Sequence, residues 1–589
     1  MKKKLLNEIL SERKLNREHR EDFLSQMNQY DYLTGLPSMT FYFVLEDLGR
    51  KKNLENGKHS AIVYFNFRGM KDYNRKFGYS EGDQLILDLS QLIVKYFGKE
   101  CCGRFGSDHF SAFAAADEVE DKLNALMKEV RNLNDGKSLP LVAGIYLDEI
   151  ENVNASLACD RAKMACDELN HSAECDFRYF DMKMLEKEIR RQYILDNLDR
   201  AIKERWIQVF YQPIIRVVGG QVCEEESLAR WIDPEKGMIY PNEFIPVLEE
   251  SGLIHKLDLC IIDQVLEKMQ LFEENGMVVV PASINISRND FDACDIVEEI
   301  RKRVDNAGID RSRLNIEITE SVIGSDFDYI KEQIERFRNL GFKVWMDDFG
   351  SGYSSLDVLQ NIDFDLIKLD MRFIQQFDNS RKSRVLLTEI MKMVIGMGAE
   401  ALCEGVETKE QVEFLQEIGC MKIQGYYFCK PIPLDEIFKR YEMGAEIGME
   451  NPREAEYFSV ISKFNLNDTS VISSSDPNVL SHYMDTIPAV VLEVGKDEVV
   501  LVRSNSSGKE FMKHFLRPGR NLENLRLPAD ERPVFVEAVR KCREDGNWTK
   551  IDDVLEDGTT VQSYLRVLGV NPVNKARAVA VIVLALVSD

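Results

Sequence analysis

Long apolar runs and a signal-peptide core are both missing from this chain of 589 residues. The longest apolar run, residues 578–587, is about half of the ~20 residues that a membrane-spanning helix needs, so it predicts a buried strand. The N-terminal segment MKKKLLNEILSERK is basic, but charged residues interrupt it before an apolar core can form. These absences predict a cytoplasmic protein without a membrane span.

Cysteine pairs with metal-binding spacing are absent as well. The twelve cysteines contain no CxxC motif and follow no regular spacing, which is typical of reduced thiols in a large intracellular chain. Positive charge is scarce relative to negative charge, since 75 Lys and Arg oppose 100 Asp and Glu for a net charge of −25. This balance argues against nucleic-acid binding and means that an anionic substrate would need bound cations.

What is present is the composition of a folded globular protein, with 44% hydrophobic and 30% charged residues. The length predicts about three or four domains. Residues 1–30 have apolar residues at helical spacing and predict an amphipathic helix that contacts a second copy. Residues 31–183 alternate strands such as SAIVYFNF with helical stretches, which predicts an α+β domain with hairpins.

Residues 184–445 change to short strands separated regularly by amphipathic helices. Eight such strands over roughly 250 residues fit a closed (β/α)8 barrel of the TIM type better than an open sheet. The predicted strands are QVFYQPII, ESLARW, VVVPASINIS, LNIEITE, KVWMDDF, LIKLD, EALCEGV and MKIQGYYF.

The last part of the chain begins with a polar linker, residues 446–470. Residues 471–589 then form strand pairs with alternating apolar positions and a helix near SSGKEFMKHF, which predicts a small antiparallel α+β domain. The predicted fold class is therefore multidomain, mixing α+β domains with an α/β barrel.

Polar side chains recur at one position of the predicted barrel, close to the ends of seven successive strands. In barrels of this type the strand ends meet the following loops, and active groups gather there. An acidic residue at a single strand end is usually just solvated, but repetition around nearly the whole barrel favours a shared site. The residues are Glu226, Asn285, Glu317, Asp347, Asp348, Lys368, Glu404 and Gln424.

Five carboxylates in one place would repel one another unless something positive sat among them. Oxygen donors without Cys or His suit Mg²⁺ or Mn²⁺ rather than zinc. The adjacent Asp347 and Asp348 suit two ions, which would clamp a phosphodiester and activate a water for hydrolysis. Lys368 would orient that water, Glu404 would ligate metal or take the proton, and Arg230 would contact a phosphate.

The motifs ESLARW, INIS, EITES, MDDFGSGYSSL, IKLD, CEGVET and QGYYF, in this order, resemble the EAL family of cyclic di-GMP phosphodiesterases along the whole barrel. The signature triplet is Glu-Ser-Leu here, with Ser227 in place of Ala. The resemblance implies hydrolysis of cyclic di-GMP to linear pGpG with two Mg²⁺ or Mn²⁺ ions, in a barrel with one antiparallel strand. No catalytic position of the family is lost. Degenerate members bind without cleaving, so a non-catalytic cyclic di-GMP effector is the alternative.

The resemblance also implies a role for each site residue. Glu320 would steady the loop of residues 348–355, which the family uses for metal binding and dimer formation, so a homodimer is expected. The implied metal ligands are Glu226, Asn285, Glu317, Asp347 and Asp348, the implied water-activating pair is Lys368 and Glu404, and the implied substrate-lining or supporting residues are Gln212, Arg230, Asp370, Glu407 and Gln424.

Residues 31–183 resemble the GGDEF family of diguanylate cyclases through DYLTGLP and GRFGSDHF. The departures lie in the catalytic positions: Asn66 and Arg68 replace two Asp residues, Ser107 replaces the second signature Gly, and His109 replaces the signature Glu. Losing this negative charge from a site for two cations and a triphosphate predicts that synthesis is abolished, which disfavours a bifunctional enzyme. His109 is either a replacement metal ligand or, as we expect, a loop histidine with a local hydrogen bond.

Part of the nucleotide site of that family is retained. The resemblance places Asn74 and Asp83 at the guanine-recognising positions, and Lys71 and Asp108 are also present. The family's inhibitory RxxD pattern is absent, because the corresponding stretch reads FGKE. We therefore expect a GTP-sensing or dimerising module.

Residues 471–589 resemble a PAS sensor fold in the opening IPAVVLEVGKDEVVLVRSNSSGKEFM and the closing apolar strand. A generic antiparallel sheet docked on the barrel is the alternative. No haem or flavin attachment pattern is present, so no cofactor is assigned to this domain.

Overall fold

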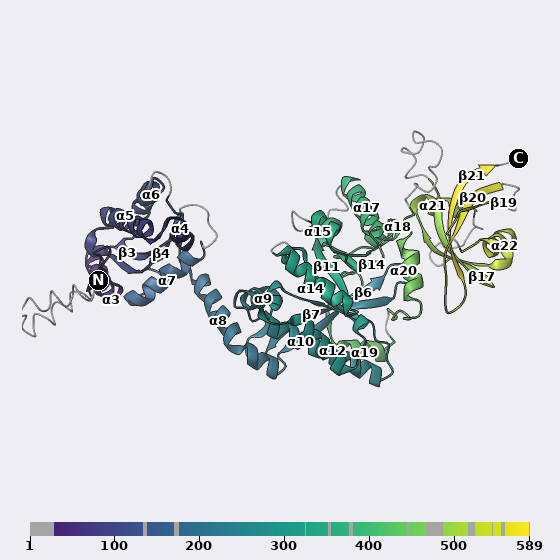
Figure 1. The fold of residues 1–589 in the computed structure, drawn as a ribbon, viewed down its shortest axis with the longest axis horizontal. Helices are drawn as coiled ribbons and strands as arrows, with labels where there is room; N and C mark the ends of the chain where they lie inside the picture. The colour runs from purple at the N-terminus through teal and green to yellow at the C-terminus, as the bar shows by residue number, and fades with distance from the viewer. Residues whose placement is uncertain are drawn as a thin grey trace, which may run out of the picture. The chain divides into compact units, whose positions relative to one another are not determined.

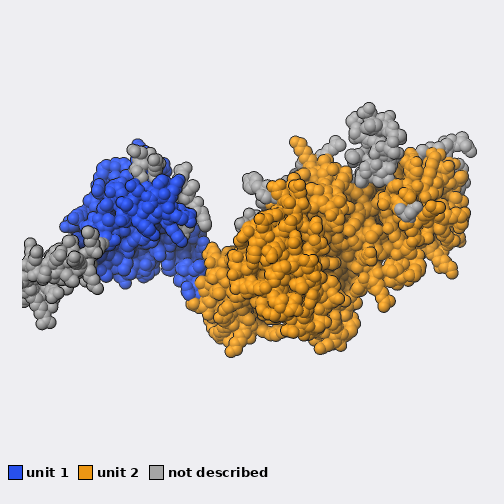
Figure 2. All heavy atoms as spheres, in the orientation of Figure 1, with its two compact units in different colours: residues 1–193 blue, residues 194–589 orange. Residues whose placement is uncertain are grey.

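The protein forms two compact units, residues 1–193 and 194–589 (Figure 2). The structure, a computed structural model, describes residues 29–133, 138–169, 176–323, 326–350, 355–375, 381–444, 447–466, 487–515, 525–544, 546–554 and 560–587. The predicted N-terminal helix therefore lies almost entirely outside the described residues, as do the end of the predicted linker and the first residues of the third domain.

Unit 1 is built on a five-stranded sheet in the order β2-β3-β1-β4-β5. The central strand β1 pairs antiparallel with β3 on one side and β4 on the other, and a separate apolar core lies on each side of the sheet. Hairpins and helices together confirm the α+β prediction. The strands are β1 (Ser60–Phe67), β2 (Cys102–Gly106), β3 (His109–Ala115), β4 (Leu141–Leu147) and β5 (Asp176–Tyr179), and the helices are α3 (Met39–Glu55), α4 (Met70–Phe77), α5 (Tyr79–Phe97), α6 (Val119–Val130) and α7 (Ala155–Asp167).

A ten-stranded sheet forms the centre of unit 2, and the additional pairing of β6 with β7 closes it into a ring of β6, β14, β13, β12, β11, β10, β9 and β7. The eight predicted strands are these eight, so the barrel prediction is confirmed. Strand β6 is antiparallel to both of its ring neighbours, β7 and β14, whereas the other ring pairings are parallel. The strands are β6 (Ile207–Arg216), β7 (Val222–Asp233), β8 (Gly237–Ile239), β9 (Ala282–Asn285), β10 (Leu314–Thr319), β11 (Lys343–Phe349), β12 (Leu366–Leu369), β13 (Glu400–Cys403), β14 (Lys422–Ile423) and β15 (Ile432–Pro433).

Amphipathic helices surround this ring (Figure 1). In α10 and α12, for example, the buried positions recur at three- and four-residue spacing, which turns one apolar stripe toward the strands. The described helices of the barrel are α9 (Pro241–Glu250), α10 (Ile254–Glu274), α11 (Arg288–Ala293), α12 (Ile296–Ala307), α13 (Glu320–Ile323), α14 (Phe327–Asn339), α15 (Ser355–Asn361), α16 (Met371–Gln375), α17 (Arg381–Gly396), α18 (Lys409–Glu417) and α19 (Leu434–Glu442). Helix α8 (Met182–Lys203) crosses the boundary between the two units.

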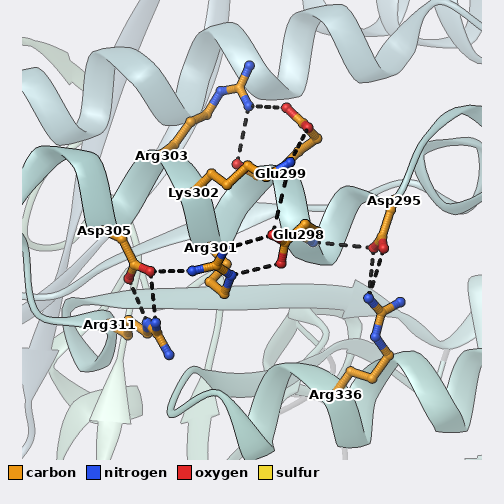
Figure 3. A network of polar contacts seen from close by, with 9 residues as sticks. All are labelled: Asp295, Glu298, Glu299, Arg301, Lys302, Arg303, Asp305, Arg311 and Arg336. Carbon is orange, nitrogen blue, oxygen red and sulfur yellow. Dashed lines mark hydrogen bonds and ion pairs between the residues drawn. The ribbon is translucent and has the colours of Figure 1, made fainter.

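The polar face of α12 carries a network of ion pairs (Figure 3). Arg301 contacts both Glu298 and Asp305 at 2.6 Å, and Arg311 reaches the same Asp305 at 2.8 Å. Arg336 of α14 joins the network through Asp295, at 2.9 Å. The network ties two neighbouring helices of the barrel together on their solvent side.

The end of the barrel at which the parallel strands begin is closed by buried charges. Lys422 of β14 lies 2.6 Å from Glu224 and 2.5 Å from Glu400, the first residue of β13. Arg216, at the end of antiparallel β6, contacts Glu450 at 2.9 Å, and both side chains are at most 5% exposed. These pairs neutralise charge that would otherwise be buried alone.

The C-terminal part of unit 2 is a six-stranded antiparallel sheet in the order β18-β17-β16-β21-β20-β19. Residues 578–587, the longest apolar run, lie in its strand β21, and no described helix of the chain is long and apolar enough to span a membrane. The antiparallel sheet agrees with the prediction, while its sensor identity stays a prediction. The elements are α20 (Ala455–Lys463), β16 (Ala489–Val494), β17 (Glu498–Ser504), α21 (Ser506–Phe515), β18 (Arg526–Pro528), α22 (Pro533–Lys541), β19 (Thr549–Val554), β20 (Thr560–Val570) and β21 (Arg577–Val587).

Candidate functional site

The polar residues predicted to share a site are carried by neighbouring strands of the ring. Asn285 ends β9 and lies opposite Glu317 of β10, and Asp347 of β11 lies opposite Thr319 of β10. Lys368 is in β12, while Glu404 and Gln424 directly follow β13 and β14. Parallel strands with this register present these side chains at one end of the barrel.

Lys368 is the centre of the cluster. Its Nζ lies 2.8 Å from Glu317, 2.8 Å from Glu404, 3.2 Å from Asp347 and 3.4 Å from Glu226. The Lys368 side chain is 1% exposed. Four carboxylates from four strands therefore surround one ammonium group.

Burial and mutual repulsion govern the protonation of this cluster. Burial by itself would lower the pKa of Lys368, but the surrounding carboxylates raise it well above the usual value. Burial raises the pKa of Glu317 well above its ordinary value, against the opposing effect of Lys368. Burial likewise raises the pKa of Glu404 to about 7, again opposed by Lys368. Four carboxyl groups thus share one ammonium group, whose single positive charge cannot neutralise all of them when they are ionised.

Amide side chains orient Glu226 within the cluster. Gln424 donates to its Oε2 at 2.7 Å, and Asn285 donates to its Oε1 at 3.4 Å. Gln212 lies opposite Glu226 in the β6–β7 pairing, but its amide donates to the carbonyl of Cys429 at 3.3 Å. Gln212 thus joins β6 to the segment after β14, beside the cluster.

The Asp347–Asp348 pair lies at an irregularity in β11. The register with β12 shifts between Met346 and Phe349, and Asp348 has a φ of 56°. Left-handed backbone is unusual for a non-glycine residue, and such strain is commonly found at functional sites. Burial, followed by Asp347 and Asp370, raises the pKa of Asp348. The backbone N–H of Gly350 donates to Glu320 at 3.3 Å, so Glu320 holds the start of the predicted loop, whose residues 351–354 lie outside the described residues.

Asp370, Arg230 and Glu407 are not among the residues that contact Lys368. Asp370 pairs with Arg372 at 2.9 Å, and this arginine lowers the pKa of Asp370 although burial opposes the shift. Arg230 lies over the ring of Phe210, 5.6 Å from its centre, and burial lowers its pKa. Glu407 is exposed. Sequence reasoning missed Arg372, although its place two residues after Asp370 was a usable signal.

The donor set fits a hard divalent cation. All its ligating atoms would be oxygens, and the buried Oε1 atoms of Glu317 and Gln424 accept no hydrogen bond. In the described part of the chain, no three Asp, Glu, His or Cys side chains already surround a common point at metal-ligand geometry, because the carboxylates turn toward Lys368. Charge, donor type and unsatisfied oxygens all favour cation binding at this end of the barrel.

In unit 1, two positions at which the sequence predicts departures from the cyclase family face one another. Asn66 lies opposite His109 in the β1–β3 pairing, and buried atoms of both, Oδ1 of Asn66 and Nδ1 of His109, make no hydrogen bond. The His109 ring stacks at a tilt on Tyr64, with centroids 5.7 Å apart. Arg68 donates to the carbonyl of Leu169, which takes its charge away from these two residues. Ser107, with a φ of 48°, makes the turn into β3.

The predicted guanine-recognising residues lie on two successive helices, Asn74 on α4 and Asp83 on α5. The Oδ1 of Asn74 is buried without a hydrogen bond, and a Cβ at Gly82 would lie 1.9 Å from it. A side chain at position 82 would therefore require the Asn74 amide to move. Asp83 is exposed on the adjacent turn.

Two protein families match this chain. The EAL domain matches residues 195–431, and the "Diguanylate cyclase, GGDEF domain" matches residues 28–172. A relative from Pseudomonas aeruginosa, "Cyclic di-GMP phosphodiesterase NbdA", is 29% identical over 454 residues, which are 73% of this chain and 56% of that protein. Another from the same organism, "Bifunctional diguanylate cyclase/cyclic di-GMP phosphodiesterase MucR", is 25% identical over 72% of this chain and 63% of its own length.

The chain spans less than two thirds of the length of these curated relatives. Among solved structures, "PaMucR Phosphodiesterase, c-di-GMP complex" is 29% identical to this chain. It covers 42% of this chain and 99% of its own, with a TM-score of 0.40.

Proposed function

Because this chain carries a GGDEF domain followed by an EAL domain, we propose that its barrel hydrolyses cyclic di-GMP to linear pGpG. The observation that carries the proposal is the convergence of Glu226, Glu317, Asp347 and Glu404 on Lys368 at one end of the barrel. A buried site in which carboxyl groups outnumber the cations is expected of a metal-dependent hydrolase rather than of a structural core.

Two divalent ions, Mg²⁺ or Mn²⁺, are the proposed cofactors, and when bound they would supply an activated water and stabilise charge on the phosphodiester. The side chains proposed to hold them are Glu226, Asn285, Glu317, Asp347 and Asp348. The unsatisfied Oε1 of Glu317 and the irregular backbone at Asp348 support this assignment.

Lys368 and Glu404 are the proposed catalytic residues. Lys368 is proposed to hold an ammonium charge beside the reacting phosphate and to orient a water. Glu404, which contacts Lys368 at the same end of the barrel, is proposed to accept the proton of the attacking water. A contact of 2.8 Å between Lys368 and Glu404 holds the two side chains next to each other.

The remaining predicted residues are assigned to the substrate. Arg230 lies in β7 beyond Glu226, over the ring of Phe210, and is proposed to contact a phosphate. Gln212, Asp370, Glu407 and Gln424 are proposed to line or support the pocket. Glu320 is proposed to steady the loop after β11 that joins metal binding to formation of a homodimer.

For unit 1 we propose a regulatory role without synthesis. Asn66 and His109 face each other where two carboxylates would be needed to hold cations, and neither contributes negative charge. Asn74 and Asp83 are proposed to bind the guanine of GTP, which would make this domain a sensor or dimerising module.

The test is incubation of the purified protein with cyclic di-GMP and either Mn²⁺ or Mg²⁺, followed by chromatography of the products. Linear pGpG is expected, and the Glu226→Ala variant is the control that should not release it. Tight binding of intact cyclic di-GMP without turnover would replace the proposal with the non-catalytic effector. Incubation with GTP alone is expected to yield no cyclic di-GMP.

A further inference from the structure

Helix α18 begins at the loop that carries Glu404. Thr408 caps the helix, and the side chain of Gln411 accepts hydrogen bonds from the backbone N–H groups of Glu407 at 2.8 Å and Thr408 at 3.1 Å. Loop and first helical turn are therefore one hydrogen-bonded piece. A shift of α18 would move the backbone just after Glu404.

The other end of α18 is held by the C-terminal domain. Arg503 of β17 donates to the carbonyl of Gln416 in the last turn of α18, and also to Ile461 at 2.8 Å and Ser462 at 3.1 Å at the end of α20. Figure 1 shows α18 and α20 on the side of the barrel nearest the C-terminal sheet. One guanidinium thus joins two helix ends and a strand of another domain.

This arginine is buried to an unusual degree, with 2% of the residue exposed. Burial lowers its pKa to about 10, so it remains charged near neutrality. The carbonyl oxygens at two helix C-termini, each the negative end of a helix dipole, compensate that charge. Because a buried charge is costly without its partners, the contact strongly favours one position of α18 relative to β17.

Further contacts reach the same helix from the C-terminal domain and its connecting segment. Lys509 of α21 pairs with Glu413 at 2.6 Å, Ser506 donates to Glu417 at 3.0 Å, and the N–H of Leu466 donates to the carbonyl of Glu417 at 3.1 Å. All of these contacts lie in the second half of α18. The first turn of α18 instead contacts the loop that follows Glu404.

We infer that Arg503 is a positioning residue through which the C-terminal domain sets the placement of Glu404, and so the rate of the barrel reaction. The inference rests on the proposed phosphodiesterase function. Among the described residues, the hydrogen-bond partners of Arg503 include none of those proposed to bind substrate or metal; Arg503 would act through a nine-residue helix held at both ends. Of the residues proposed to line or support the pocket, only Glu407 lies in the segment tied to α18, so substrate binding is expected to change less than the rate.

The test compares Arg503→Met with Arg577→Met in the full chain. Arg577 is a matched control because it also caps a helix, donating to Val539 at 3.1 Å, Arg540 at 3.2 Å and Cys542 at 3.1 Å at the end of α22, without reaching the barrel. Arg503→Met is expected to lower kcat about tenfold with KM within about twofold of wild type, and Arg577→Met to leave both within about twofold.

A second measurement does not depend on activity. Hydrogen exchange in Arg503→Met is expected to rise in residues 404–417 and to stay unchanged in α14, while Arg577→Met leaves residues 404–417 as in wild type. Should Arg503→Met fail to fold, Lys509→Ala removes a part-exposed contact to the same helix and is expected to produce the same changes on a smaller scale.

The outcomes separate the two claims. Absence of turnover by the wild type would end the proposed function, whereas the exchange experiment would still test the clamp on α18. Wild-type kcat in Arg503→Met, or equal losses in Arg503→Met and Arg577→Met, would overturn the inference. A change in KM alone would do the same.

Discussion

Lys368 and Glu317 form an ion pair of 2.8 Å in which neither side chain is more than 1% exposed. The two residues come from adjacent parts of the barrel wall, β12 and β10, with only β11 between them in the sheet. Three further carboxylates share the same ammonium. Substituting the lysine tests its role in the rate, and substituting a carboxylate tests its role in binding metal ions. The two effects can be measured separately.

Replacing Lys368 with Ala is expected to lower kcat by at least about 100-fold while changing the affinity for cyclic di-GMP far less, because the ammonium acts on charge that develops during the reaction. Steady-state kinetics and equilibrium binding measure the two effects. Lys430→Ala, which removes the cation lying 5.3 Å from the Tyr426 ring outside the cluster, is the control. Unchanged kcat in Lys368→Ala would rule out the proposed role.

Divalent ions are expected to stabilise the folded barrel, because they bind the over-acidic cluster only when it is assembled. The midpoint of thermal unfolding, followed by tryptophan fluorescence, should rise on addition of Mn²⁺ or Mg²⁺. Asp347→Asn should abolish most of the rise, whereas Asp365→Asn, at a carboxylate bonded to the backbone of Val344 at 2.8 Å, should not. An equal rise in both variants would speak against the assigned ligands.

Glu46 of α3 is expected to make unit 1 less stable as the pH rises. Burial, opposed by Arg50, raises its pKa from 4.5 to about 7. The folded state therefore favours the protonated carboxyl: this stabilisation is full below pH 4.5, declines between 4.5 and 7, and is lost above that range. The change is on the order of 3 kcal/mol.

Glu46→Gln removes this titration, since the amide stays neutral. Hydrogen exchange of β1 amides in the two proteins, compared at the same pH, should show greater protection in the variant at pH 8 and similar protection at pH 4. Equal protection at both values would mean that Glu46 does not titrate in this range.

Buried and exposed ion pairs in unit 2 should differ sharply in their effect on stability. Arg216→Met leaves Glu450 buried without its partner and is expected to cost about 3–5 kcal/mol. Arg301→Ala, in the solvent-facing network of Figure 3, is expected to cost about 1 kcal/mol or less. Denaturant unfolding monitored by tryptophan fluorescence measures both, and similar costs would contradict this ranking.

Much of the architecture followed from sequence pattern alone. The alternation of short apolar strands with amphipathic helices predicted the barrel, because each element must turn one apolar side toward a common core. The motifs from ESLARW to QGYYF predicted the family model that matches residues 195–431, the EAL domain. In unit 1 the sequence also indicated that Asn66 and His109 depart from the cyclase pattern. It did not predict that the two residues pair across β1 and β3.

Tertiary structure alone decided how those residues meet. The sequence placed Lys368 and four carboxylates on separate strands, but only ring closure through β6 and β7 brings them to contact distance, since those contacts join residues as many as 142 positions apart. Likewise, nothing local distinguishes Arg503 from an exposed arginine in a strand; its burial against Gln416 depends on the docking of two domains. Local pattern specifies which face of an element is buried, whereas the choice of partner depends on long-range packing.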